Sequence, residues 1–476
     1  MNEILKSLGI KGKAGNVPKE DFGNEGNGKS GKVEPVAGAE GSNRKSEEHT
    51  TKGTKKSEEV DLSNKKCLVY DFGLFTEVAN KLGEKFGKVH YFVPWTEAFP
   101  KAIKSLIGEG FENMERIKYF WDYVDEADLI VFPDTHCSDI VNFLRDKGYP
   151  VAGVGDAEEL ELDRIKGRKE QEKAGLPTQQ TDVVKGLTKL EKFLKEHKKV
   201  VIKLNTYRGD VETWSQDDWE DSEPKIARLK VEWGPKGEEL NFVIEEKLDG
   251  IEPGLDGILY KGEVVSPTMV GFEIKGAGYI GKVYDYKDVP EGIKLISDKM
   301  APVFKKLNYS FWMSSELILT KQRKGFFIDP CLRLAAPVPN AVQQEMIKNY
   351  AEVFWGMGHD EKVIPEYTAK YGGGASFYSS FVEEGNWARI KFDKKNRQWI
   401  KFREACCYGG NYWAVPKAST ICSVIGTGDT PEEVIEKIQE ISKSVKAVGS
   451  NIDKSSADFV ELRSELAEVK KYGIEF

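Results

Sequence analysis

The chain has 476 residues, of which 39% are hydrophobic and 31% charged, and 78 acidic residues against 70 basic ones give a formal net charge of −8. This length predicts about three domains, and the acidic balance argues mildly against a protein that coats nucleic acid through phosphate contacts. No apolar run approaches the roughly 18 to 20 residues that span a bilayer, and residues 1–13 lack the apolar core of a secretory signal. Six scattered cysteines without a Cys-x-x-Cys pair argue against a disulfide framework or a zinc site, so we expect a reducing cytoplasm.

Residues 1–64 are rich in Gly, Lys, Glu, Ser and Asn, with acids and bases nearly balanced. Such a segment buries too little apolar surface to offset the entropy lost on ordering, so we predict a disordered tail. Within it, residues 2–10 would present one apolar face if they became helical, formed by Ile4, Leu5, Leu8 and Ile10. Two interpretations stay open for this short peptide: it folds on the groove of a partner protein, or it is an unstructured terminus.

Residues 65–155 alternate short apolar strands with helices. The strands are predicted at 66–72, 89–95, 127–134 and 151–155, and the helices at 76–87 and 137–148. This alternation is typical of βαβ units and predicts a parallel sheet. The segment lacks a Gly-x-Gly-x-x-Gly pattern, so it does not match the dinucleotide-binding fingerprint.

Residues 156–340 contain most of the side chains to which chemistry can be assigned. A charged helix begins at residue 156 and stops at Gly175, ahead of Pro177. Arg164 and Arg168 are four residues apart and therefore share a face of this helix. Taken alone, that face is interpreted as a solvated basic surface.

Lys203 lies in the middle of a predicted apolar strand at 200–204. An unpaired buried ammonium is costly, and an anionic ligand such as a phosphate would supply the missing partner. Arg208 and Gly209 follow in a turn that could fold over phosphates. The acidic run at 217–223 is interpreted as a solvated insertion.

Two predicted strands at 311–319 and 325–339 each carry a carboxylate after an apolar stretch, Glu316 and Asp329. Carboxylates on adjacent strands can share a hard divalent cation with nucleotide phosphates. Arg333 follows Asp329 by four residues and is positioned to hold an anion. Upstream, a β-rich run over 241–265 contains Glu245, Glu246, Lys247 and Leu248, followed by Gly250 and Glu252.

Residues 270–291 form a glycine-rich, aromatic stretch flanked by Lys275 and Lys282. We weigh equally a binding surface for an acidic or phosphorylated substrate and an ordinary β-hairpin with exposed lysines. Beyond it we predict a helix at 341–360, strands within 371–410, and a strand, a glycine turn and a long helix at 421–448. A last charged helix at 453–472 carries an apolar stripe and is expected to dock on the core, through Leu462, Leu466 and Val469.

Taken in order, these features resemble the ATP-grasp superfamily of ligases, and within it phosphoribosylamine–glycine ligase. The matching order is a basic helix ending in Gly-Leu-Pro-Thr, the strand lysine Lys203, the run Glu245–Leu248 with Gly250 and Glu252, then Glu316 and Asp329-x-x-x-Arg333. The resemblance covers about residues 66–447. It implies an α/β (α+β) fold with a parallel-sheet domain at 65–155 ahead of the ATP-grasp core, the core at 156–340 with a lid at about 180–248, and a C-terminal lobe at 341–476.

The resemblance also implies roles for the matched residues. Arg168, with Lys166 or Lys169 as alternatives, would be the first nucleotide-binding cation, and Lys203 the second. The adenine edge would be received by Glu245, Glu246, Lys247 and Leu248, and the ribose hydroxyls by Glu252. Glu316 and Asp329 would bind magnesium, and Arg333 would stabilise the acyl-phosphate and the tetrahedral intermediate. ATP-binding roles extend to Arg208 and Gly209, and a substrate role to Lys275 and Lys282.

Two departures from the family pattern concern the phosphate and metal sites. The family usually ends this strand with Glu-x-Asn, where this chain has Asp329-Pro330-Cys331. A cysteine is a soft ligand and a poor substitute for an amide oxygen on magnesium. The loop at 205–209 is also poorer in glycine than a phosphate loop of this family.

The leading interpretation is an ADP-forming, ATP- and magnesium-dependent ligase that joins a small carboxylate to a small amine through an acyl-phosphate. One alternative is a catalytically silent nucleotide-binding or assembly protein that uses its N-terminal tail to bind a partner. A second alternative keeps the ligase chemistry and directs it at a nucleic-acid base or a peptide.

The composition of the tail gives a first prediction. Deleting residues 1–60 should leave ATP binding and the melting temperature nearly unchanged, because a segment so poor in apolar residues adds little to a core. Calorimetry and thermal unfolding of the two proteins check this. A large loss of either property would show that the segment is part of the fold.

Overall fold

The computed structural model describes residues 60–94, 104–206, 213–274, 278–336, 338–418 and 420–476. The predicted peptide at 2–10 and the tail as far as residue 59 lie outside the described residues, as do Arg208, Gly209 and Lys275. Residues 60–64, which we assigned to the tail, are described, and Leu62 is only 3% exposed. The folded part therefore begins earlier than the composition indicates.

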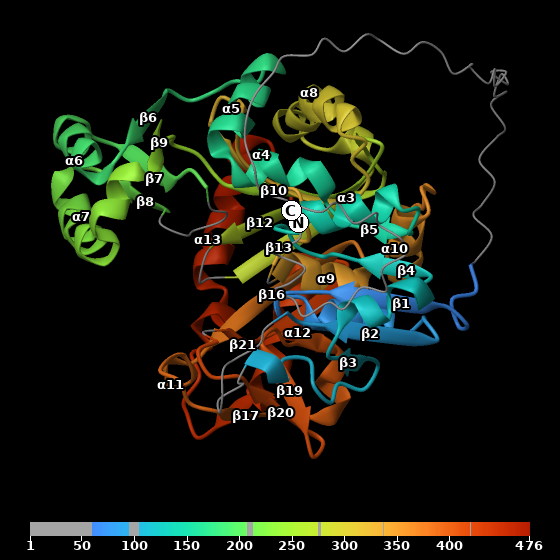
Figure 1. Cartoon of the computed structure of the whole chain (residues 1–476). Helices are drawn as coiled ribbons and strands as arrows, with labels where there is room; N and C mark the ends of the chain where they lie inside the picture. Colours follow the sequence, from blue (N-terminus) through green and yellow to red (C-terminus); the bar gives the residue numbers. More distant parts are fainter. Residues whose placement is uncertain (1–59, 95–103, 207–212, 275–277, 337, 419) are drawn as a thin grey trace, which may run out of the picture. The chain divides into compact units, whose positions relative to one another are not determined.

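The first apolar segments form a five-stranded parallel sheet with the order β3-β2-β1-β4-β5, as the alternating pattern predicts. Helices α2 (Thr76–Leu82) and α3 (Ser138–Asp146) accompany it, shown in blue and cyan in Figure 1. Strand β3 escaped prediction because two of its three residues, Glu115 and Arg116, are charged, so the segment has no apolar run. The strands are β1 (Lys66–Tyr70), β2 (Lys88–Phe92), β3 (Glu115–Ile117), β4 (Leu129–Val131) and β5 (Val151–Ala152).

The predicted single helix from residue 156 is wrong, because the chain breaks at Asp163. Helix α4 (Glu159–Leu162) ends there, and α5 (Arg164–Lys173) begins with Asp163 as its N-cap, whose side chain accepts the N–H of Lys166 at 3.1 Å. A short polar side chain at that position favours starting a new helix. Gly167 lets the two helices approach, since a Cβ there would lie 2.5 Å from the carbonyl oxygen of Leu160.

The next segment forms a four-stranded antiparallel sheet, β6-β9-β7-β8, covered by α6 (Leu187–Glu196) and α7 (Trp219–Trp233). These elements have a hydrophobic core of their own, which includes Leu190, Ile202 and Leu229. The acidic run at 217–223 exposes most of its carboxylates to solvent, as predicted, and it forms the N-cap and first turn of α7, where the carboxylate of Asp221 accepts two backbone N–H groups. The strands are β6 (Thr181–Lys185), β7 (Val200–Leu204), β8 (Thr213–Gln216) and β9 (Asn241–Glu246).

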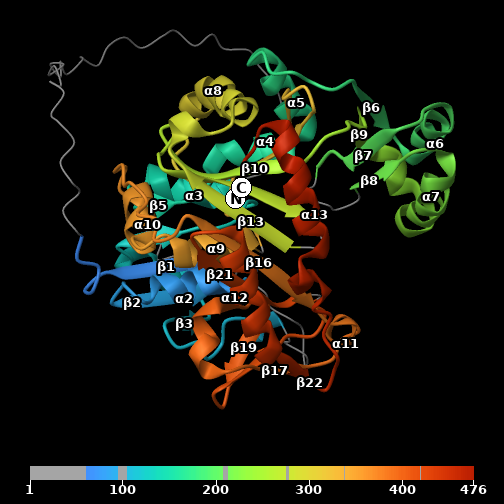
Figure 2. The ribbon, with the colours of Figure 1, turned by 180° about the vertical axis from the view of Figure 1, so that it is seen from behind.

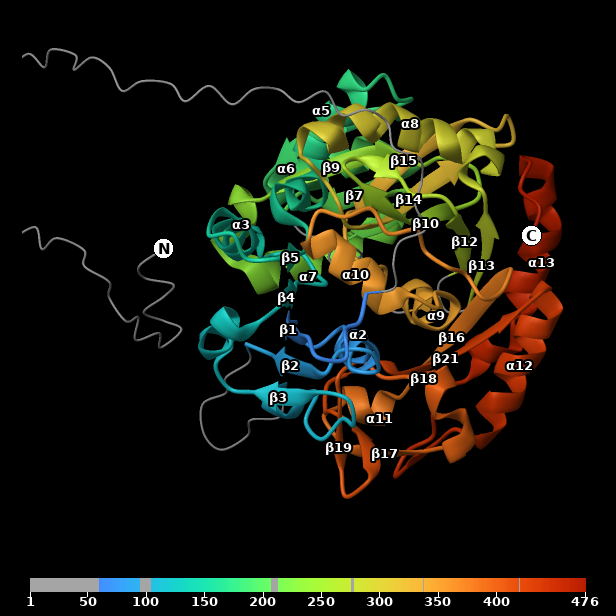
Figure 3. The same ribbon diagram turned by 90° about the vertical axis from the view of Figure 1, so that its right-hand side faces the viewer.

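The largest sheet has nine strands, eight of them in the order β15-β14-β10-β12-β13-β16-β21-β18 with antiparallel pairing, and β11 paired to β10 (Figure 3). It runs without interruption across residue 340, because β13 pairs with β16. The strands are β10 (Pro253–Tyr260), β11 (Glu263–Val264), β12 (Thr268–Ile274), β13 (Gly278–Tyr284), β14 (Trp312–Leu319), β15 (Gly325–Cys331), β16 (Tyr371–Tyr378), β18 (Ile400–Lys401) and β21 (Thr420–Gly428).

Helices α8 (Glu291–Lys306), α9 (Val338–Met346) and α12 (Pro431–Ser444) pack on this sheet, and α10 (Tyr350–Gly358) reaches β4 and β5 of the first sheet. The single helix predicted at 341–360 is therefore two helices. They separate because Ile347 pairs with Tyr367 and the N–H of Lys348 donates to the carbonyl of Glu366. A small antiparallel sheet follows, β19-β20-β17-β22, with the short helix α11 (Ser380–Glu383).

That small sheet consists of β17 (Ala388–Lys391), β19 (Ala405–Tyr408), β20 (Asn411–Ala414) and β22 (Lys446–Val448). The last predicted helix is α13 (Val460–Val469), and its stripe docks as expected, with Leu462 and Val469 fully buried. No helix in the part of the chain that the structure describes combines the length and the apolar character needed to cross a membrane.

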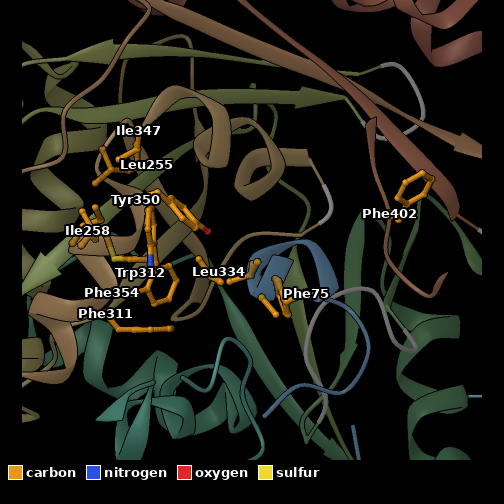
Figure 4. Close-up of a cluster of buried hydrophobic side chains, with 14 of the residues drawn as sticks. Phe75, Leu255, Ile258, Phe311, Trp312, Leu334, Ile347, Tyr350, Phe354 and Phe402 are labelled. Carbon is orange, nitrogen blue, oxygen red and sulfur yellow. The ribbon is translucent and has the colours of Figure 1, made fainter. Parts of the chain in front are cut away.

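The main core is built around aromatic residues where α10 meets strand β14 (Figure 4). Phe354 is fully buried, with ring centroids 6.1 Å from Phe311, 5.8 Å from Trp312 and 5.3 Å from Tyr350. Because α10 also contacts the first sheet, this cluster joins the first sheet to the central one.

Replacing Phe354 tests this junction. Phe354→Ala should lower the free energy of unfolding by about 3–5 kcal/mol, because it removes a buried ring and leaves a cavity. Urea unfolding measures the change, with Val231→Ala at an exposed helix position as the control. Equal stability of the two variants would contradict the packing described here.

Candidate functional site

A cleft of about 590 Å³ is lined by strands β10, β12, β14 and β15 and by α13. Of the residues to which the sequence assigned chemistry, it brings together Glu252, Glu316 and Arg333. Gly250 and Cys331 line it as well. A Cβ at Gly250 would lie 2.5 Å from the carbonyl oxygen of Leu319, so only glycine lets this segment approach β14 closely.

Glu316 and Asp329 face each other across the β14–β15 pair, as the strand prediction requires. The side chain of Glu316 is exposed and lines the cleft, whereas Asp329 is 6% exposed and accepts a hydrogen bond from Nη1 of Arg164 at 2.8 Å. Opposed residues of an antiparallel pair have side chains on the same face. The two carboxylates therefore share a face, and one of them is already neutralised by a guanidinium.

The donor set fits a hard divalent cation that takes its remaining ligands from a nucleotide. Carboxylate oxygens suit magnesium, which usually binds one or two carboxylates together with phosphates and water. Burial raises the pKa of the Cys331 thiol well above its ordinary value, with Glu316 adding to the effect, so this residue is a neutral thiol. Within the described ranges, no group of three or more His, Cys, Asp or Glu side chains is placed to hold a metal by itself.

Arg333 is nine-tenths buried and is held by two acids that the sequence analysis did not single out. Its Nε donates to Glu161 Oε1 at 3.0 Å and lies 3.8 Å from Asp134 Oδ1, while Glu161 also accepts the N–H of Leu332 at 3.1 Å. Burial alone would lower the pKa of Arg333, but the carboxylates of Glu161 and Asp134 raise it above its ordinary value. The guanidinium is therefore a fixed, permanent positive charge at the cleft.

A second charged cluster joins the antiparallel β6–β9 sheet to the rest of the site. Lys203 on β7 is 5% exposed, and its Nζ lies 3.0 Å from Glu245 Oε2 on β9. Glu245 also accepts from Nε of Arg168 on α5. Neither Lys203 Nζ nor Glu245 Oε2 makes a hydrogen bond of good geometry with the residues that the structure describes. Beyond its ion pair with Glu245, the buried ammonium of Lys203 has no partner among the described residues, and Lys203 is not among the residues that line the cleft.

Arg168 and Arg164 do not form the solvated basic face that the helix pattern favours, and that interpretation is wrong for both. Arg168 donates to Gln171 at 2.7 Å, to the carbonyl of Ile328 at 2.8 Å and to that of Phe327, in addition to Glu245. The interpretation applies instead to Lys166 and Lys169, which are exposed. Arg168 is the more completely satisfied cation, and Lys203 the less.

Glu245 supplies the negative charge that partly neutralises Lys203 and Arg168. Burial would raise its pKa, but the opposite charges of Lys203 and Arg168 outweigh that effect and lower the pKa to about 2. The carboxylate is therefore ionised at neutral pH, although it is only 1% exposed. Its neighbours in the predicted adenine-binding run differ: Glu246 and Lys247 are exposed and Leu248 is half-buried.

Two backbone N–H groups of the run 245–248 already donate hydrogen bonds within the protein. The N–H of Glu246 donates to the carbonyl of Gln180 at 3.0 Å, and the N–H of Lys247 to that of Lys199 at 2.9 Å. Lys247 also forms an exposed ion pair with Asp217 at 2.9 Å. These contacts tie residues 246 and 247 to the β6–β9 sheet.

Lys282 does not join the residues that line the cleft. It lies on β13, donates to the carbonyl of Glu475, and sits 4.8 Å from the ring centroid of Tyr284. Strands β12 and β13 pair in antiparallel fashion from Thr268 opposite Tyr284 to Ile274 opposite Gly278.

The sequence analysis missed the contribution of α13. Its residues Glu461, Ser464 and Glu465 line the same cleft as Glu316 and Arg333. Their spacing of three and four residues places them on one helix face, and that spacing is the one signal in the sequence that could have revealed them.

No protein-family model matches the chain, and no curated protein matches its sequence. Solved structures do share its fold. Phosphoribosylamine–glycine ligase from Thermotoga maritima aligns with a TM-score of 0.63 at 17% identity, over 82% of this chain and 99% of that one. The biotin carboxylase domain of 2-oxoglutarate carboxylase from Hydrogenobacter thermophilus, a complex with MgADP, ADP and bicarbonate, gives 0.60 at 13% identity, over 87% and 99%.

L-amino acid ligase from Bacillus licheniformis aligns with a TM-score of 0.54 at 14% identity, over 81% of this chain and 99% of that one. The predicted α/β architecture and the resemblance to ATP-grasp ligases are therefore confirmed as a likeness of fold. At these identities the likeness extends to the fold alone, so the roles of individual residues rest on the geometry above.

Glu245→Gln tests the charged cluster through stability. At pH 7 the free energy of unfolding of the variant should be about 3–5 kcal/mol lower than that of wild type, because two buried cations lose their shared carboxylate. A carboxylate whose pKa is lowered on folding stabilises the protein above its unfolded pKa. The difference between wild type and variant should therefore shrink as pH falls from about 4.5 towards 2. Urea unfolding across this range measures it, and a difference independent of pH would contradict the assignment.

Proposed function

We propose that the protein is an ATP- and magnesium-dependent ligase that joins a carboxylate to an amine and releases ADP and phosphate. The observation that carries the proposal is that Glu316 and the permanently charged Arg333 line one cleft in a fold shared with such ligases. Lys203 supports it, since its buried ammonium has donors available for an anion.

Lys203 is the proposed phosphate ligand from this part of the chain. Arg168 has its donors engaged by Glu245, Gln171 and two carbonyls, so we assign it the role of orienting Glu245 and, through it, Lys203. Glu252, exposed at the cleft, is placed to accept the ribose hydroxyls. The adenine-binding role of residues 245–248 and the phosphate role of Arg208 and Gly209 follow from the resemblance.

Glu316 and Asp329 would hold Mg²⁺, which neutralises phosphate charge when bound. In the proposed reaction, a carboxylate oxygen of the acid attacks the γ-phosphorus of ATP, and the bond to ADP breaks. The amine nitrogen then attacks the carbonyl carbon of the acyl-phosphate, phosphate leaves, and the nitrogen loses a proton. In this proposal Arg333 stabilises the negative charge that develops in both steps, because a prearranged cation lowers such a barrier.

A second candidate function has one observation in its favour. The ion pair between Arg164 and Asp329 engages a proposed magnesium ligand, and Cys331 stands where an amide would be expected. A protein that binds ATP without turning it over would tolerate both features. The cytoplasmic location that we propose for either function is supported by six cysteines that are all free thiols.

One experiment separates the two functions. Incubating the protein with ATP, Mg²⁺ and a panel of small carboxylates and amines should give substrate-dependent ADP release. That release should fall at least a hundredfold in Lys203→Ala and Asp329→Ala, a loss typical of removing one electrostatic group from an active site. ADP and product mass are measured together, with Lys230→Ala on exposed helix α7 as the control. Tight ATP binding without turnover across the panel would favour the silent protein.

A further inference from the structure

Helix α13 closes one side of the cleft with a polar face. Leu462 and Val469 are buried on its inner side, while Glu461, Ser464 and Glu465 are exposed and line the cleft. Figure 2 shows the helix, in red, beside the strands of the central sheet, among which it contacts β12. The cleft is thus bounded by a helix distant in sequence from the strands that carry Glu316 and Arg333.

Contacts at both ends hold the helix in this place. Phe459 at its start packs under Gly278, where a Cβ would lie 2.6 Å from the ring and where φ is +115°. Beyond its end, the carbonyl of Glu475 accepts from the hydroxyl of Tyr284 at 2.7 Å and from Lys282, and Phe476 lies 6.2 Å from Phe272. The anchoring explains why Lys282 is turned away from the cleft. The wall is therefore a built part of the site.

The charge of this wall is not balanced within the helix. Glu461 and Glu465 are like charges four residues apart on one helix face, an arrangement that destabilises an isolated helix. Neither forms an ion pair with the described residues, whereas Arg463 pairs with Glu432 and Glu468 with Lys471. A local conflict of this kind is expected where a surface serves a ligand.

The cleft therefore combines charges of both signs. Arg333 is its nine-tenths buried cation, with Nη2 4.0 Å from the sulfur of Cys331, and a fixed guanidinium of this kind attracts a carboxylate. At α13, the two glutamates repel a carboxylate and attract a cation. The hydroxyl of Ser464, between them on the same face, can accept a hydrogen bond from an ammonium.

We propose that α13 selects the amine, and that this amine carries a second, distal ammonium held by Glu461 and Glu465. The class is a diamine or a basic amino acid, whose other nitrogen attacks the acyl group near Arg333. The inference rests on the ligase function proposed above, and it assigns the carboxylate of the acid to Arg333 and the distal ammonium of the amine to α13.

Pairs of amines that differ in the distal charge test the proposal. Full-length protein with Mg²⁺ and a non-hydrolysable ATP analogue is titrated with 1,4-diaminobutane or pentylamine, and with L-lysine or L-norleucine. The charged member of at least one pair should bind about tenfold more tightly, and Glu461→Gln with Glu465→Gln should abolish that preference, the size expected for two surface ion pairs. Which pair shows the preference distinguishes a diamine from a basic amino acid.

Glu468→Gln on the same helix is the matched control, since its carboxylate pairs with Lys471 and not with the cleft. It should keep the preference, and all three proteins should keep the same affinity for the ATP analogue. Equal binding of charged and uncharged amines by wild type, or an equal loss in the control, would overturn the inference. Amine-dependent ADP release is followed separately. If the protein prefers charged amines but releases no ADP, the ligase function is wrong and amine binding by α13 stands. If ADP is released but is unaffected by Glu461→Gln and Glu465→Gln, the ligase function stands and the role of α13 is wrong.

Discussion

The carboxylate of Glu245 is the contact on which the arrangement of the site depends. It lies on β9, and it meets Lys203 from β7 and Arg168 from α5, which in turn reaches the backbone of β15. Three segments far apart in the chain are joined by one ionised group that is almost fully buried. Because burying either cation alone would be costly, the β6–β9 sheet, α5 and the central sheet can form this junction only together.

Arg333, like Lys203 and Arg168, is a buried cation held by acidic residues. Its guanidinium is fixed by Glu161, which precedes α5, and by Asp134, which follows a strand of the parallel sheet. Each cation of the site is thus oriented by an acid from a different part of the fold. Charges fixed in this way need no rearrangement when negative charge develops on a substrate, which is the main source of electrostatic catalysis.

The parts of this site that depend on short-range pattern could be predicted from the sequence, and the parts that depend on long-range pairing could not. The apolar strand around Lys203 and the opposed positions of Glu316 and Asp329 follow from strand periodicity and adjacency. Glu161 meets Arg333 across 172 positions of sequence, and no local pattern selects that acid from the others in its helix. The break at Asp163 was missed because a capping residue inside a charged run resembles any other exposed aspartate.

The separate hydrophobic core of the β6–β9 sheet has a consequence for the energetics of movement. Because Leu190, Ile202 and Leu229 bury one another within this segment, a change in its position would leave their mutual contacts intact. The free energy of such a change would depend chiefly on polar contacts at its border, above all those of the two cations with Glu245. In the ligase proposed above, salt concentration and the charge of a bound phosphate would then influence the movement more than the hydrophobic effect would.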